Sequence, residues 1–118
     1  MIDHVAIPVR DLEASRRFYE PLLTELGAKV VMEWPGAVIF GTDDGMVALR
    51  QSEEVVPHHV AFKADRPGVD SFYEAALAAG ASDNGPPGLR PDFHENYYAA
   101  FVIDPDGHNI ESVCHRPE

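Results

Sequence analysis

The sequence is poor in cysteine, in basic residues and in long apolar runs. Its single cysteine, Cys114, excludes an internal disulfide framework. Nine Lys and Arg against twenty Asp and Glu give a net charge of -11, which disfavours nucleic acid and anionic membrane surfaces as partners. No apolar run approaches the roughly 20 residues that a membrane-spanning helix needs. The first residues also lack the basic and apolar regions of a signal peptide. We therefore expect a cytoplasmic protein that binds neither nucleic acid nor membrane.

What the sequence does contain is an internal repeat. Three short segments of the first half recur in the same order in the second: residues 4–7 as 59–62, 18–20 as 72–74, and 26–28 as 79–81. A repeat of about 55 residues is too small to bury a sufficient core alone. The repeat predicts one domain over residues 1–118, built from a first module at 1–56 and a second at 57–118. It also places His4 and His59 at equivalent points of the two modules.

Periodicity predicts the same order of elements in both modules. Residues 2–9 alternate as a strand whose apolar face excludes His4, and a helix capped by Asp11 follows and ends near Gly27. Three short strands then complete the first module, within residues 28–34, 37–40 and 46–49. The second module begins with a strand that points His59 away from its apolar face, followed by a helix capped by Asp65. The pattern favours an α+β fold.

The end of the chain reads as a hairpin preceded by a long loop. Strands at residues 97–103 and 108–115 flank the turn sequence Asp-Pro-Asp-Gly at 104–107. Residues 83–96, with three prolines, show little helix or strand signal, and long loops in compact domains are often functional. In the last strand Glu111 lies opposite the apolar Ile110 face.

The strand faces on which these polar residues lie suggest a metal site. If the sheets curl together, His4, His59 and Glu111 share one cleft. Two imidazoles and one carboxylate can hold one face of an octahedral Fe, Mn, Ni or Zn ion and leave positions open for substrate. We take His4, His59 and Glu111 as the candidate metal ligands. His58 is a weaker alternative to His59, because its parity turns it to the opposite face.

The chain resembles the vicinal oxygen chelate superfamily of glyoxalase I, extradiol dioxygenases, fosfomycin-resistance enzymes and bleomycin-binding proteins. The resemblance rests on four segments: residues 3–5, 18–19, 59–62 and 104–111. It implies two tandem βαβββ modules forming a cupped, mostly antiparallel sheet with helices outside, and a homodimer. Family ligands come from the first and last strands of each module, which His4, His59 and Glu111 match. Ala48 or Leu49 stands where glyoxalase I has a fourth, carboxylate ligand.

The resemblance implies a divalent-metal-dependent enzyme, a lyase or isomerase of the glyoxalase type or an extradiol dioxygenase. Its small substrate would chelate the metal through adjacent oxygens, with His94 or Tyr97 as the catalytic group that handles a proton. The three-ligand set is similar to that of extradiol dioxygenases, which usually carry four modules. The alternative is a metal-free protein of the bleomycin-resistance type that sequesters a small drug. The residues leave open whether the site lies within one chain or between two copies.

Four other residues have simpler readings. His108 is expected to be a solvated turn residue and Cys114 a small buried hydrophobe. Arg50 and Arg90 are candidates for binding a substrate carboxylate, or for salt bridges at the surface.

Overall fold

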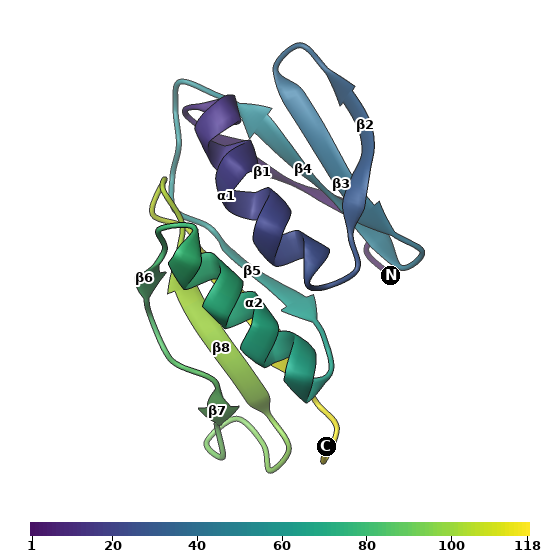
Figure 1. The fold of residues 1–118 in the computed structure, drawn as a ribbon, viewed down its shortest axis with the longest axis vertical. Coiled ribbons are helices and arrows are strands. Elements are labelled where there is room, and N and C mark those ends of the chain that lie inside the picture. Colours follow the sequence, from purple (N-terminus) through teal and green to yellow (C-terminus); the bar gives the residue numbers. More distant parts are fainter.

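The computed structural model describes residues 1–118 and contains two sheets, each backed by one helix (Figure 1). The first four-stranded sheet has the order β1-β4-β3-β2, in which β1 runs parallel to β4 and the other pairs are antiparallel. Its elements are β1 (His4–Val9), α1 (Leu12–Thr24), β2 (Lys29–Trp34), β3 (Ala37–Thr42) and β4 (Gly45–Gln51). Asp11 caps α1 as expected, its side chain accepting a hydrogen bond from the Ala14 N–H at 3.0 Å.

The second half repeats this plan. Its sheet has the order β5-β9-β8-β6, with β7 also paired to β8, and β5 runs parallel to β9. The elements are β5 (His59–Lys63), α2 (Arg66–Ala78), β6 (Ser82–Asp83), β7 (Gly88–Leu89), β8 (Tyr98–Ile103) and β9 (Asn109–Cys114). The α+β class is confirmed. The region expected to be irregular, residues 83–96, contains the short strand β7 and the last residue of β6, and both strands pair with β8.

The core lies between the helices and the sheets. Helices α1 and α2 pack side by side on the same side of the molecule (Figure 1). Residues from both halves form one apolar cluster, whose largest members include Ile7, Tyr19, Leu22, Leu49, Phe72 and Ile110. Because side chains alternate along a strand, the neighbours of these residues point to the opposite face of each sheet. That opposite face carries His4 in the first sheet and Glu111 in the second.

A buried polar junction ties the two halves together, and it corrects the expectation for His108. This side chain is not solvated but fully buried. Its Nδ1 accepts a hydrogen bond from the His58 N–H at 2.9 Å, and its Nε2 lies 2.8 Å from the Pro8 carbonyl oxygen. Beside it, the buried Tyr19 hydroxyl donates to Asp104. The turn between β8 and β9 is therefore held against the first half. Cys114 is buried as expected.

Neither helix has the length and apolarity that crossing a bilayer demands.

Candidate functional site

His59 and Glu111 meet on the face of the second sheet that points away from α2. Strands β5 and β9 are paired so that Ala61 lies opposite Glu111 and His59 opposite Asn109. The Nε2 atom of His59 lies 3.0 Å from Oε1 of Glu111, while its Nδ1 lies 3.1 Å from the Asn109 carbonyl oxygen. The Glu111 carboxylate is 2% exposed and the His59 side chain 51%. Two of the three candidate ligands are thus adjacent, one buried and one open to solvent.

Tyr97 is also placed at this pair. Its hydroxyl donates a hydrogen bond to Oε2 of Glu111, so each oxygen of the buried carboxylate faces one side chain. Burial, and then the hydrogen bond to Glu111, raise the pKa of Tyr97 to about 12, against a smaller opposing effect of the Arg90 charge. The tyrosine therefore keeps its proton at neutral pH and acts as a hydrogen-bond donor.

His94 packs against Tyr97, on the ring whose hydroxyl contacts Glu111. Its Nε2 is 2.8 Å from Nδ1 of His115, and its Nδ1 accepts from the Asn96 N–H at 3.3 Å. Both imidazole rings pack edge-on against the Tyr97 ring, with centroids 5.3 and 5.2 Å away. The structure thus places His94 against Tyr97, with His115 as its partner.

His4 stands apart from this group. Its side chain is 64% exposed, and its Nδ1 lies 2.7 Å from Asp3 of the same strand end. Within the chain, no three His, Cys, Asp or Glu side chains lie close enough together to hold a metal ion. A largely apolar groove is lined by residues of both halves, among them Val5 and Met46 of the first and His59 and Val60 of the second.

The first sheet shows whether Ala48 or Leu49 stands on the face of His4, where glyoxalase I has a fourth ligand. Strand β4 pairs with β1 so that Met46 lies opposite His4 and Ala48 opposite Ala6. Leu49 is fully buried in the core beneath the helices. Ala48 therefore shares the face of His4, and that position offers no ligand atom.

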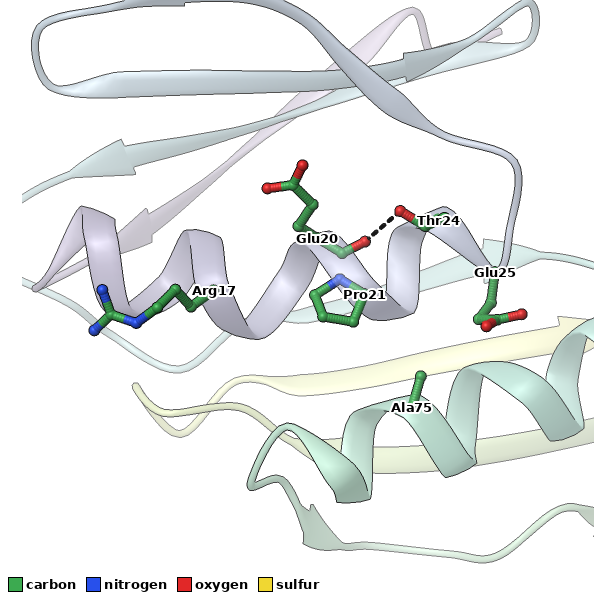
Figure 2. A pocket seen from close by; sticks show the side chains of 6 residues that line it. All are labelled: Arg17, Glu20, Pro21, Thr24, Glu25 and Ala75. Carbon is green, nitrogen blue, oxygen red and sulfur yellow. Dashed lines mark hydrogen bonds between the residues drawn. The ribbon is translucent and has the colours of Figure 1, made fainter.

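A second depression lies between α1 and α2. Figure 2 shows its lining: Arg17, Glu20, Pro21, Thr24, Glu25 and Ala75. It is shallow, and none of the candidate site residues belongs to it. The chemistry-bearing side chains lie on the sheet face instead.

The turn at 104–107 predicts the register of the last hairpin, which sets Phe101 opposite Glu111 and leaves Tyr97 four residues away on the same face. The contact between the Tyr97 hydroxyl and Glu111 therefore had no sequence signal beyond that shared face. The place of Arg90 had none either, because it depends on how the loop before β8 folds over the sheet.

Comparison with known proteins identifies the family of the chain. Residues 1–112 match the model of the glyoxalase/bleomycin resistance protein/dioxygenase superfamily. The chain belongs to this superfamily. A relative of this chain is the uncharacterized protein YqjT of Bacillus subtilis (strain 168), 32% identical over 94% of this chain and 96% of the relative.

Solved structures of superfamily proteins share the fold. A glyoxalase/bleomycin resistance protein from Albidiferax ferrireducens T118 superimposes with a TM-score of 0.87, at 28% identity, covering 97% of this chain and 98% of that one. The fosfomycin resistance protein FosX of Mesorhizobium loti gives a TM-score of 0.72 at 26% identity, covering 97% and 91%. The expected superfamily is therefore confirmed.

Proposed function

We propose that this chain is a divalent-metal-dependent enzyme of the glyoxalase or extradiol dioxygenase type, acting on a small substrate that presents adjacent oxygens. The observation that carries the proposal is the approach of His59 to the buried carboxylate of Glu111. Superfamily membership supports the reaction class.

The donor atoms of this pair suit a cation. The Asn109 carbonyl oxygen can only accept, so the hydrogen of a neutral His59 imidazole belongs on Nδ1. Nε2 then directs a lone pair at a carboxylate oxygen only 3.0 Å away. Two lone pairs at this distance repel unless a proton or a metal ion lies between them. A backbone carbonyl that orients the other ring nitrogen is a common support for a metal-binding histidine.

The third ligand would come from a second copy of the chain. The sheet carrying His4 has an exposed apolar edge, where Val31, Met32 and Trp34 are 46%, 49% and 51% exposed. Apolar side chains gathered on one strand mark a contact surface. We infer a homodimer in which the first sheet of one copy covers the second sheet of the other, bringing His4 to the partner's His59 and Glu111.

A bound Fe, Mn, Ni or Zn ion would supply positive charge that stabilises an oxyanionic state of the substrate. Residues of the chain itself position the carboxylate and transfer the proton. Tyr97, protonated at neutral pH, holds Glu111 in place through its hydroxyl. His94, paired with His115, is the nearby imidazole that would accept or return a proton.

Metal content tests the proposal. Protein purified without chelator should contain near-stoichiometric metal, which Glu111→Ala and His59→Ala abolish and His58→Ala, the neighbouring-histidine control, retains. Elemental analysis measures this, and the identity of the metal selects the assay. Absence of metal from the parent protein after reconstitution would refute the proposal and favour the metal-free drug-binding alternative.

Mixing two inactive variants tests the shared site. His4→Ala and Glu111→Ala each break every site in their own homodimers. A mixed dimer has one intact site, because the His4 of one copy meets the intact His59 and Glu111 of the other. Metal binding should therefore return on mixing. No recovery, despite subunit exchange, would place all three ligands in one chain.

A further inference from the structure

The loop before β8 holds a guanidinium group over the neighbours of the His59–Glu111 pair. Phe101 lies opposite Glu111 on the adjacent strand, so both side chains share one face of the sheet. The Arg90 guanidinium carbon sits 5.3 Å from the centre of the Phe101 ring. That ring in turn stacks on the His59 imidazole, with centroids 6.3 Å apart. Arg90 is therefore one aromatic ring away from the candidate metal ligands.

The loop fixes this cation in place. Nη1 of Arg90 donates to the Gly88 carbonyl and Nη2 to the Pro86 carbonyl, both at 2.8 Å, and the Arg90 backbone N–H donates to the Tyr97 carbonyl at 2.7 Å. Cation–π contact with Phe101 adds to these bonds. The arginine is half-buried and loses most of its rotational freedom on folding.

Two glycines make room for the guanidinium. A Cβ atom built on Gly85 would lie 3.1 Å from Nη2 of Arg90 and 3.0 Å from the Phe101 ring. One built on Gly88 would lie 3.3 Å from Nη1. Gly85 also has φ +145°, which an L side chain rarely adopts. The loop is thus built around the Arg90 side chain.

The placement of this charge is unusual for such an acidic chain. With nine basic and twenty acidic residues, most surface positions repel anions. Here, however, a cation is held over the Phe101 ring, which in turn stacks on His59. A guanidinium carries five N–H groups in a planar fork that matches a carboxylate. The Gly88 and Pro86 carbonyls take one hydrogen from each terminal nitrogen, which leaves others free for a ligand.

We propose that Arg90 is a specificity-determining residue that selects substrates bearing a carboxylate or similar anionic group. This rests on the proposed function, since the anion would be part of the substrate at the same site. An anionic substrate beside Glu111 meets a like charge, and a preorganised cation offsets that repulsion without a further entropy loss. A neutral analogue gains no binding free energy from the Arg90 charge.

Binding of oxalate to the metal-free protein tests the proposal. The probe pair is oxalate and its uncharged isostere oxamide, titrated with chelator present and followed by NMR chemical shifts. Wild-type protein should bind oxalate at least tenfold more tightly than oxamide. Arg90→Gln should weaken oxalate binding about tenfold, which is the loss of roughly one charge-assisted hydrogen bond. Arg17→Gln, the same change in charge on the helical face, should leave it unchanged.

A third variant separates charge from loop structure. Arg90→Lys keeps the positive charge but loses the planar fork, so its oxalate affinity should lie between those of wild type and Arg90→Gln. Equal losses in both variants, or equal losses for oxalate and oxamide, would show that Arg90 only holds the loop and overturn the proposal. Because metal is absent throughout, failure here is distinct from failure to find metal in the parent protein.

Discussion

Glu111 carries a carboxylate at a buried position in the second sheet. Its carboxylate is removed from water, and its two oxygens face His59 and Tyr97. Burying a carboxylate is costly unless partners replace its hydration. Removing either partner therefore perturbs the other, so the three side chains act as one unit. The changes in the free energy of unfolding caused by their single substitutions should not be additive.

Tyr97→Phe tests this unit at high pH. The pKa of Tyr97 is raised from 10.0 to about 12 in the folded protein, so the protonated phenol is the form that folding favours. Its contribution to the free energy of unfolding is fully present below about pH 10 and is lost as pH rises through about 12. The difference in unfolding free energy between wild type and Tyr97→Phe should stay constant up to about pH 10 and then shrink. Urea unfolding over a pH series measures it.

Glu111→Gln is the companion variant. It removes the carboxylate charge but keeps the burial that is the largest cause of the raised pKa. The tyrosinate absorbance of Tyr97 should then appear at lower pH than in wild type, yet still above the ordinary range. An unchanged titration would mean that Tyr97 and Glu111 are not in contact in solution.

At the scale of elements, helix α1 tolerates a proline in its interior. Pro21 has no N–H to donate to the carbonyl of Arg17, one turn earlier, yet the helix continues to Thr24. Figure 2 shows the exposed ring beside the depression between α1 and α2. The buried residues that follow, Leu22 and Leu23, hold this turn in place through the core. Packing here overrides local propensity.

Pro21→Ala should therefore stabilise the protein. Restoring the hydrogen bond and the helix propensity is expected to raise the free energy of unfolding by about 1–3 kcal/mol, reduced from the full interior cost because the unfolded chain regains freedom. Arg17→Ala on the same exposed helix face serves as control and should change it by less than about 0.5 kcal/mol. A destabilised Pro21→Ala variant would show that the ring itself packs favourably. Chemical denaturation distinguishes these outcomes.

At the scale of the whole molecule, the two halves are joined through a buried imidazole. His108 bridges the His58 N–H and the Pro8 carbonyl, and so connects residues about 50 and 100 positions away in the chain. Tyr19 and Asp104 make a second buried bond across the same junction. Burial, and then the Asp104 charge, raise the pKa of Tyr19 far above its ordinary value.

His108→Ala should loosen this junction. Two partly buried backbone groups would lose their partners and a cavity would form, which together cost about 2–4 kcal/mol in the free energy of unfolding. His58→Ala keeps the backbone N–H that His108 binds and removes only an exposed ring, so it should cost less than about 1 kcal/mol. Urea denaturation with both variants tests the comparison. Equal effects would mean that the imidazole bridge contributes little.

Much of the fold was predictable because local signals were consistent. Asp11 and Asp65 cap the two helices, their side chains accepting from the N–H three residues on. The turn at 104–107 fixed the hairpin that sets Glu111 beside its neighbours. His108 is the opposite case. A polar residue beside a tight turn reads as solvated, and only contact with the distant Pro8 buries it.

The sequence by itself determined the order of elements, the superfamily and the faces on which His59 and Glu111 lie, because strand and helix periods are local properties of the chain. Tertiary structure alone decided which of these side chains meet. It paired Glu111 with His59 and Tyr97, folded the Arg90 loop over Phe101, and left His4 apart on the other sheet. The physical reason is that these contacts depend on how separate elements pack against one another, and that packing is set by the shape of a core shared between both halves.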